Sequence, residues 1–393
     1  MLSWMFRHEF GKFFRGGLVY WPPLFLWSEY RYTFRGWYFG RKGELLLEPE
    51  ILISGRKIGR RYPPFVIAEI GINHEGNMEK AKRMIDDAAS VGCECVKFQS
   101  HIIEDEMSSE AKRVIPANAD ESIWDIMNRC ALGEEQEREL KEYAEQKGLV
   151  FLSTPFSRAA AFRLEKIGVS AYKIGSGECN NYPLIEVVAS FKKPVILSTG
   201  MNDIVSISKA VEILRKHNVP FALLHCTSMY PTPYEKIRLG ALSELQNAFS
   251  DAVIGLSDHS ESVFPAMGAV ALGASILERH FTSDLTWDGP DIPISMTPDE
   301  LKMLVEGSRI IHKSLGGEKR ILEEEAPTIA FAYASVVAIA PIEKGSLFSA
   351  ENLWVKRPGT GEILAEQLYS LFGKRAVRFI PEGAQVRRDD VEK

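Results

Sequence analysis

The sequence contains few cysteines, and their arrangement excludes two common stabilising devices. There are five in 393 residues, an odd number, and no two of them form the Cys-x-x-Cys pattern of zinc ribbons and redox motifs. Small secreted domains that depend on disulfides carry many more. We therefore expect reduced thiols in a cytoplasmic protein. The cysteines are Cys93, Cys95, Cys130, Cys179 and Cys226.

An excess of positive charge is also absent, as are long apolar runs. Lysine and arginine number 47 against 53 aspartate and glutamate residues, so the net charge is −6 and gives no electrostatic footprint for a nucleic acid. No uninterrupted apolar run approaches the roughly 18 residues that a membrane-spanning helix needs. With 45% hydrophobic residues, the composition is that of a globular protein with one large core or two unequal ones.

Residues 1–44 differ in composition from the rest of the chain. The first 40 residues hold 15 of the chain's 40 aromatic residues (7 Trp, 12 Tyr and 21 Phe), and basic residues outnumber acidic ones there. The apolar stretch 17–27 is interrupted by Pro22 and Pro23, which makes it a poor membrane helix or signal-peptide core. We predict that this extension lies outside the catalytic unit; the alternative is an anchor at a membrane surface.

From Pro64 onward, short apolar runs alternate with longer amphipathic ones. Near-continuous apolar runs are typical of buried parallel strands, and eight strand–helix units over about 250 residues indicate an α/β protein with a (β/α)8 TIM barrel. The alternative is a doubly wound sheet, but the Gly-x-Gly-x-x-Gly turn that often follows its first strand is missing. The expected strands are Phe65–Ile70, Cys95–Gln99, Val150–Ser153, Ala171–Ile174, Val195–Ser198, Phe221–His225, Ala252–Leu256 and Ser275–His280.

The composition changes again after the last of these units. We expect the barrel domain to span residues 45–315 and a linker rich in glycine and glutamate to span 316–332. Residues 333–393 then form a small β-rich module with a weak internal repeat. Its residues Ile342, Gly345, Asn352 and Leu353 recur 38 positions later as Ile380, Gly383, Asp390 and Val391, which a compact pseudo-symmetric domain would produce.

Polar side chains stand where the barrel strands end, and in a barrel these ends surround the active site. Burying such groups without partners costs about 1–3 kcal/mol each, so we expect them to bind one another or a ligand. Lysines and hydroxyls suit an anionic ligand, and a histidine pair suits an exchangeable divalent cation, with His225 as a third ligand or a structural neighbour. Glu69 and Glu178 are candidates for acid–base chemistry or for holding hydroxyls; the alternative is pairing with the lysines. The anion-binding candidates are Lys97, Lys173, Thr154, Ser176 and Ser198, the histidines are His259 and His280, and Glu278 also ends a strand.

These residues lie in motifs that resemble the bacterial sialic acid synthase family over nearly the whole chain after Leu45. The resemblance implies a barrel followed by an antifreeze-like SAF domain, and a homodimer that exchanges its SAF domains. It also implies a transferase that condenses phosphoenolpyruvate with N-acetylmannosamine to N-acetylneuraminate and phosphate, with cleavage of the C–O bond. The motifs include AEIGINHEGN (68–77), VKFQSHIIEDEMS (96–108), YKIGSGECNNYPLI (172–185), GLSDHS (255–260) and NLWVKRPGTG (352–361).

Site roles follow from the same resemblance. His259 and His280 would hold Mn²⁺ or Mg²⁺, which polarises the sugar aldehyde. Glu178 would carry a proton near phosphoenolpyruvate, and Arg357 would reach the partner's barrel. The phosphoenolpyruvate cradle would comprise Lys97, Thr154, Lys173, Ser176, Ser198 and Ser257, and the sugar site Glu69, Asn118, Ser228, Tyr230, Asp291 and Arg357.

One departure from the family pattern keeps the sugar open. Ser228 stands where related enzymes carry asparagine, and serine has a shorter reach and fewer hydrogen-bonding groups. A legionaminate or pseudaminate synthase acting on a 2,4-diacetamido-6-deoxy hexose is therefore the first alternative. A Schiff-base aldolase using Lys173 is the second. A non-enzymatic ice- or glycan-binding role for the SAF-like module would leave the strand-end polar residues unexplained.

Overall fold

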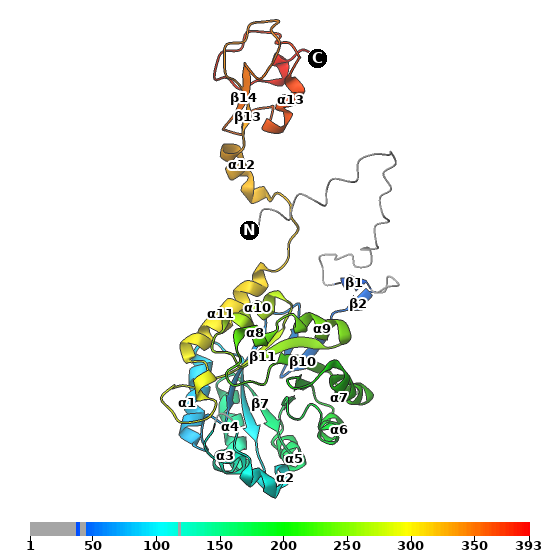
Figure 1. Cartoon of the computed structure of the whole chain (residues 1–393), viewed down its shortest axis with the longest axis vertical. Coiled ribbons are helices and arrows are strands. Elements are labelled where there is room, and N and C mark those ends of the chain that lie inside the picture. Colours follow the sequence, from blue (N-terminus) through cyan, green and yellow to red (C-terminus); the bar gives the residue numbers. More distant parts are fainter. Residues whose placement is uncertain (1–36, 40–44, 117–118) are drawn as a thin grey trace, which may run out of the picture. The chain divides into compact units, whose positions relative to one another are not determined.

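The computed structural model describes residues 37–39, 45–116 and 119–393. The chain divides into two compact units, one that ends at Gly316 and one of residues Gly317–Lys393. Helices surround the strands in the first unit, and the second unit is a small fold of short elements (Figure 1). No helix in the described ranges is long and apolar enough to cross a membrane.

Eight parallel strands form the centre of the first unit. Each strand pairs with its neighbour in parallel, in the order β7-β6-β5-β12-β11-β10-β9-β8, which is a nearly closed barrel. The predicted TIM barrel is thereby confirmed, with each strand within a few residues of its expected position. The strands are β5 (Phe65–Gly71), β6 (Cys95–Ser100), β7 (Val150–Pro155), β8 (Tyr172–Ile174), β9 (Val195–Ser198), β10 (Phe221–Cys226), β11 (Val253–Asp258) and β12 (Ile276–His280).

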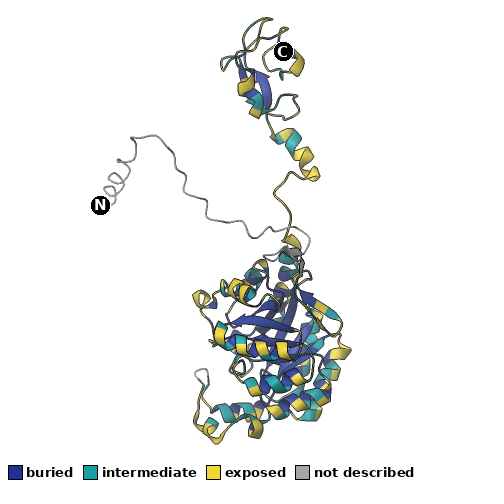
Figure 2. Ribbon diagram, turned by 90° about the vertical axis from the view of Figure 1, so that its right-hand side faces the viewer, coloured by how far each residue is buried: buried dark blue, intermediate teal, exposed yellow. Residues whose placement is uncertain are grey.

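The surrounding helices bury one apolar face against the strands (Figure 2). In α1, Asn77 caps the first turn by accepting hydrogen bonds from the Glu79 and Lys80 amides, and Met84 and Ile85 are fully buried. The helices are α1 (Met78–Ser90), α2 (Ile103–Glu106), α3 (Ile123–Cys130), α4 (Glu134–Gln146), α5 (Arg158–Ile167), α6 (Tyr182–Ser190), α7 (Ile204–Lys216), α8 (Tyr234–Ile237), α9 (Ala241–Ala248), α10 (Phe264–Ala271) and α11 (Pro298–Ser314), with 3-10 turns η1 (Ser109–Arg113) and η2 (Ile292–Ile294).

A hairpin that the sequence reading missed packs against the residues that fill the barrel. Strands β3 (Glu50–Ile53) and β4 (Arg56–Gly59) pair antiparallel, and their Ile51, Ile53 and Ile58 join the apolar cluster of inward-facing strand residues. Two further short strands, β1 (Trp37–Phe39) and β2 (Leu45–Leu47), also pair antiparallel. The rest of the predicted 1–44 extension lies outside the described residues.

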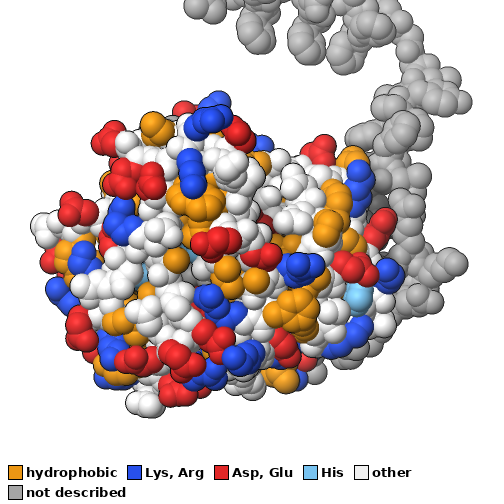
Figure 3. Space-filling view, turned by 90° about the horizontal axis from the view of Figure 1, so that it is seen from below, with side chains coloured by type: hydrophobic (Ala, Val, Ile, Leu, Met, Phe, Trp, Pro, Cys, Tyr) orange, Lys and Arg blue, Asp and Glu red, His pale blue; other side chains and the backbone are white. Residues whose placement is uncertain are grey.

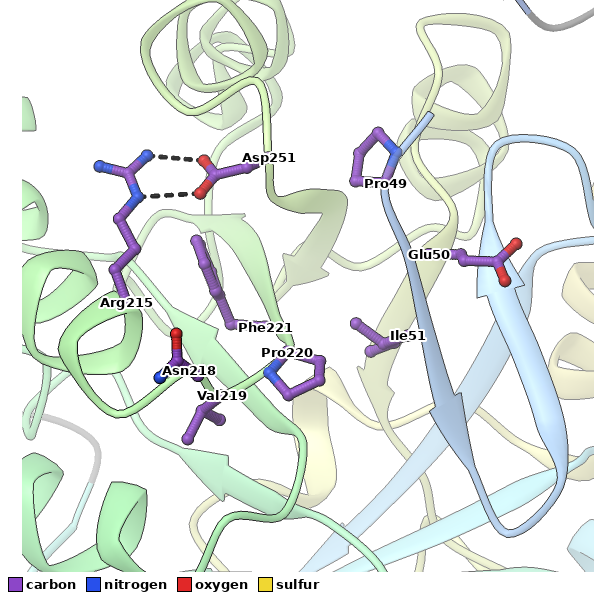
Figure 4. Close-up of a pocket in the computed structure, with 9 residues that line it drawn as sticks. All are labelled: Pro49, Glu50, Ile51, Arg215, Asn218, Val219, Pro220, Phe221 and Asp251. Atoms are coloured by element: carbon purple, nitrogen blue, oxygen red, sulfur yellow. Dashed lines mark hydrogen bonds and ion pairs between the residues drawn. The ribbon is translucent and has the colours of Figure 1, made fainter. Parts of the chain in front are cut away.

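A hollow of about 420 Å³ lies between this hairpin and the starts of the barrel strands (Figure 4). Glu50 and Ile51 line one side of it, and Phe221 and the residues near α7 line the other. Its charged side chains are already partnered, because Arg215 donates two hydrogen bonds, of 2.8 and 2.6 Å, to the Asp251 carboxylate. The hollow therefore offers little free charge for a ligand.

The second unit is built on an antiparallel pair, β13 (Ser335–Ala338) and β14 (Leu353–Lys356), over its own apolar core. The weak repeat of the sequence is visible in it. Ile342 and Ile380 exchange backbone hydrogen bonds, and Gly345 and Gly383 both adopt positive φ, at 86° and 82°. The stretch that we expected to be a linker contains helix α12 (Ala326–Ala332). The remaining short elements are α13 (Leu368–Leu371), η3 (Glu323–Glu325), η4 (Ala365–Gln367) and η5 (Arg388–Asp390).

Candidate active site

A cavity of about 390 Å³ lies at the carboxyl ends of the barrel strands. It brings together every predicted site residue except Asn118, which is outside the described residues, and Arg357, which is exposed in the second unit. Polar residues from all eight barrel strands or from the loops that follow them face it. These are Glu69, Lys97, Gln99, Thr154, Lys173, Ser176, Glu178, Ser198, Ser228, Tyr230, Ser257, His259, Glu278, His280 and Asp291.

Two buried lysines form the floor of the cavity together with two carboxylates. Lys97 Nζ lies 2.7 Å from Glu69 Oε2 and 3.8 Å from Glu278 Oε1. Lys173 Nζ donates to Ser198 Oγ at 2.7 Å and lies 3.5 Å from the same Glu278 oxygen. Glu278 thus stands between the two ammonium groups, and Glu69 extends the cluster on one side. The sequence left open whether the lysines pair with carboxylates. They do so here, and both lysines still line the cavity.

Hydroxyl groups complete this cluster. Thr154 Oγ1 accepts a hydrogen bond from Lys97 at 3.3 Å, and Ser257 donates to Glu278 at 3.2 Å. Ser176 Oγ accepts from the Gly200 amide at 3.0 Å. A Cβ atom at Gly200 would lie 2.4 Å from Ser228 Oγ and 2.9 Å from Ser176 Oγ, so only glycine lets both serines reach this wall.

Burial shifts the pKa values of the carboxyl groups upward and that of the Lys173 ammonium downward, and the neighbouring opposite charges oppose these shifts. Burial raises the pKa of Glu69, against the opposing effect of Lys97. It would also raise the pKa of Glu278, but Lys173 and Lys97 outweigh it and lower that pKa. Burial lowers the pKa of Lys173, which Glu278 partly restores. An added anion would stabilise both ammonium groups, so the floor of the cavity is suited to an anionic ligand.

The two predicted metal ligands face each other across one wall of the cavity. The ring centroids of His259 and His280 are 5.4 Å apart, and Tyr230 stacks on His259 at 4.3 Å. His259 Nδ1 donates to the Thr227 carbonyl at 3.2 Å, which leaves its Nε2 as the nitrogen with a free lone pair. His280 Nδ1 is buried without a hydrogen-bond partner and lies 3.7 Å from Asp291 Oδ2.

This donor set fits a divalent cation that takes its other ligands from water and substrate. In the described ranges no cluster of three or more His, Cys, Asp or Glu side chains has the geometry of a metal site, so a closed structural site is not formed there. His225, weighed above as a third ligand, instead donates from Nε2 to the Ile237 carbonyl at 2.7 Å and does not line the cavity. It is a structural neighbour.

Glu178 has the chemistry of a proton carrier. Its Oε2 is buried and has no hydrogen-bond partner among the described residues. Burial, followed by the nearby Glu106 carboxylate, raises the pKa of Glu178 to about 7. A carboxyl group with this pKa exchanges protons readily near neutral pH.

One wall of the cavity is apolar. It comes from the loop after β5, from α3 and from the segment before α3. Its Ile72 and Ile126 belong to a small buried apolar cluster that also contains Cys130. The apolar residues of the wall are Ile72, Pro116, Ala119, Ile123, Ile126 and Met127.

Two cavity residues had no assigned role in the sequence reading. Glu278 and Gln99 were recognised only as residues that end predicted strands. Side chains alternate along a strand, so Glu278 and His280 share the inner face of β12 while Arg279 points outward. The same alternation puts Lys97 and Gln99 together on β6. The alternation of side chains along these two strands was therefore the sequence signal that could have identified Glu278 and Gln99 as cavity residues.

Comparison with known proteins identifies the family of the chain. The NeuB family model matches residues 84–320 and the SAF domain model matches residues 333–392. The chain belongs to the NeuB family, whose members are synthases of sialic acids and related sugars.

The chain is similar to several characterised relatives. It is 38% identical to the N,N'-diacetyllegionaminic acid synthase of Campylobacter jejuni, over 82% of this chain and 98% of the relative. It is 34% identical to human N-acetylneuraminate-9-phosphate synthase, over 87% and 96%. A solved structure, the N-acetylneuraminic acid synthetase of Leptospira borgpetersenii in complex with citrate, superposes with a TM-score of 0.66 at 35% identity, over 72% of this chain and 95% of that one.

Proposed function

We propose that this protein condenses phosphoenolpyruvate with the open-chain aldehyde of N-acetylmannosamine to form N-acetylneuraminate and phosphate. The observation that carries the proposal is the juxtaposition of two buried lysines and two facing imidazoles in one cavity. The first pair supplies charge for a phosphorylated carboxylic acid. The second supplies a site for the cation that activates a carbonyl.

Phosphoenolpyruvate fits the floor of the cavity. Its carboxylate and phosphate would lie against Lys97 and Lys173, with the hydroxyls of Thr154, Ser176, Ser198 and Ser257 as donors. Because Lys173 is fully buried and already held by Ser198, its ammonium is preorganised for the anion. The anion would share both ammonium groups with Glu278.

In the reaction, C3 of phosphoenolpyruvate forms a bond to the aldehyde carbon, and water then adds at C2. Phosphate leaves with the C–O electron pair. Glu178, beside the floor of the cavity, is placed to give a proton to the developing alkoxide or the leaving phosphate. Mn²⁺ or Mg²⁺ held by His259 and His280 would supply Lewis-acid polarisation of the aldehyde.

The sugar would occupy the outer part of the cavity. Tyr230, Asp291 and Ser228 line the cavity with hydroxyl and carboxylate groups, Glu69 would reach the sugar from the floor, and Asn118 is assigned to the sugar site by the family resemblance. Arg357 of a second subunit would complete the site at the N-acetyl group in a domain-swapped homodimer. The loop that carries Arg357 is exposed in the second unit, as such a role requires.

A second sugar is favoured by a specific observation. The wall formed by α3 and its neighbouring loops is apolar, and the C. jejuni relative is a diacetyllegionaminic acid synthase. A 6-deoxy carbon and the methyl group of a second acetamido substituent would bury apolar surface there, at about 25 cal/mol per Å². A 2,4-diacetamido-6-deoxy hexose is therefore the second candidate substrate. A 6-phosphorylated sugar is less suited, because the described lining holds no lysine or arginine beyond Lys97 and Lys173.

The test is phosphate release in the presence of phosphoenolpyruvate and Mn²⁺, with each sugar in turn. We expect turnover with N-acetylmannosamine. Faster turnover of the diacetamido sugar would reverse the order of the two candidates, and no release with either would refute the proposal. All five cysteines are buried and free, which suits the reducing cytoplasm that we propose as the site of action.

A further inference from the structure

A line of hydrogen bonds runs from the active-site cavity into the protein behind it. Gln99 Nε2 donates to Glu69 Oε1 at 3.1 Å, and Gln99 Oε1 lies 3.1 Å from His101 Nε2. On the far side of the imidazole, His101 Nδ1 lies 2.8 Å from Glu106 Oε2. Gln99 and Glu69 line the cavity, whereas His101 does not.

The hydrogen-bonding role of Glu69 sets the roles of Gln99 and His101 along this line. Glu69 Oε2 is held by the Lys97 ammonium at 2.7 Å, so its carboxylate acts as an acceptor and takes the NH2 group of Gln99 on Oε1. The carbonyl oxygen of Gln99 then faces His101, which must donate from Nε2. If the Gln99 amide were rotated by 180°, its Oε1 would face Glu69 Oε1 at hydrogen-bonding distance, and no donor would lie between the two oxygens.

His101 is built into the fold so that it presents this nitrogen. Its side chain is 1% exposed, and its ring stacks on Phe156 with centroids 4.6 Å apart and planes 15° apart. The Glu106 carboxylate accepts a hydrogen bond from Nδ1 and so fixes the orientation of the ring. Of the neighbouring titratable groups, His74 is neutral at pH 7, because burial, followed by the nearby His101, lowers its pKa to about 4.

The backbone leaves room for the Gln99–Glu69 contact. Gly71 has φ of +55°, and a Cβ atom there would lie 3.3 Å from both Gln99 Nε2 and Glu69 Oε1. The contact is therefore accommodated by the strand end of β5, and its direction is set by His101.

We propose that His101 is a positioning residue for the reaction: by donating to Gln99 Oε1, it turns the Gln99 NH2 group toward Glu69 and the sugar end of the cavity. It acts through Gln99 and touches neither substrate. The proposal rests on the proposed synthase function, since its kinetic effect is measured on that reaction.

The kinetic test compares two variants of the full-length enzyme. His101→Phe keeps the stack on Phe156 but removes the donor. We expect kcat to fall by about ten- to a hundredfold, as for other supporting partners of active-site groups, while KM for phosphoenolpyruvate stays within about twofold. His101→Gln places an amide donor near Nε2 and should recover most of the loss. His217→Phe is the matched control, because His217 also pairs with a glutamate, Glu186, at 2.8 Å, but outside the barrel.

The proposal is overturned if His101→Phe turns over like the wild type, or if His101→Gln falls as far as His101→Phe with both variants folded by circular dichroism. It is also overturned if the kcat losses of His101→Phe and Gln99→Leu multiply in the double variant. Multiplied losses mean additive free energies, and residues that act in series do not have additive free-energy effects. Losses that do not multiply support it.

A readout without turnover separates this proposal from the synthase function. In protein labelled with ¹⁵N-histidine, the proposal predicts a proton on His101 Nε2 at pH 7.5, with its resonance absent from His101→Phe and shifted in Gln99→Leu. A bare Nε2 would overturn the proposal whatever the enzyme synthesises. Wild-type protein that releases no phosphate, yet shows this protonated nitrogen, would refute the synthase function alone.

Discussion

Arg279 donates a hydrogen bond from Nη1 to the Asp258 carboxylate, and each of these residues directly adjoins one of the two facing imidazoles in sequence. Both side chains are almost fully buried, on the outer side of the barrel strands. Arg279 also donates to the Ser260 carbonyl at 2.6 Å and so holds the loop that follows His259. The ion pair thereby joins the ends of β11 and β12 and fixes the spacing of the imidazoles.

Replacing Arg279 by methionine should therefore destabilise the protein. It leaves Asp258 buried without its partner, which costs about 3–5 kcal/mol. Denaturant unfolding with an unchanged m-value measures the loss. The double variant Asp258→Asn, Arg279→Met should recover part of it, because no uncompensated charge remains. An Arg279→Met protein as stable as the wild type would show that the pair does not hold the loop.

His259→Ala should abolish turnover and weaken Mn²⁺ binding while the barrel stays folded. The substitution removes a side chain from the cavity wall, where its ring contacts Tyr230, rather than from the apolar core. Mn²⁺ binding is measured by calorimetry on the free protein, and folding by circular dichroism. Full activity with unchanged metal dependence would show that the cation, if required, is held elsewhere.

Glu178 should give the reaction a pH dependence near neutrality. Its pKa is raised to about 7, so the carboxyl is mostly neutral below that pH and charged above it. Phosphoenolpyruvate is an anion and binds better when Glu178 is neutral, so kcat/KM for phosphoenolpyruvate should fall as the pH rises through about 7. In Glu178→Gln this step should vanish and kcat should drop by about 10²–10⁴. A Glu178→Gln profile that keeps the step would assign it to another group.

Arg357→Ala should raise KM for the sugar far more than KM for phosphoenolpyruvate. Mixing Arg357→Ala with His259→Ala subunits tests whether the arginine crosses between subunits. A mixed dimer then contains one barrel with both its histidines and a complete arginine, so part of the activity should return. No recovery, with mixed dimers present by native mass spectrometry, would place Arg357 in its own subunit's site or outside the reaction.

The barrel was predictable because each of its strands is buried on both sides. Runs such as Phe65–Ile70 and Val195–Ser198 are almost wholly apolar, and the polar residues that interrupt the pattern lie at the strand ends. The hairpin β3–β4 was missed because each of its strands has only four residues. Buried Ile51 and Ile53 alternate with exposed residues in β3, but the run is too short to give a clear period.

The site was predictable by position but not by partner. Strand ends identify which residues reach the cavity, yet the position of Glu278 between Lys97 and Lys173 depends on the register between strands that are distant in sequence. The line from Glu69 through Gln99 to His101 likewise depends on side-chain direction. The surface in Figure 3 carries acidic and basic side chains interspersed, which agrees with the absence of a basic excess in the composition.

In the proposed reaction, an enol and an activated aldehyde meet in one cavity. This reaction is tested most directly by incubating the protein with Mn²⁺, candidate sugars and phosphoenolpyruvate that carries ¹⁸O in its bridging position, followed by mass spectrometry. We predict a nine-carbon keto acid from N-acetylmannosamine and the label in the released phosphate. Product that retains the label, or borohydride trapping of pyruvate on Lys173 in its place, would contradict the account.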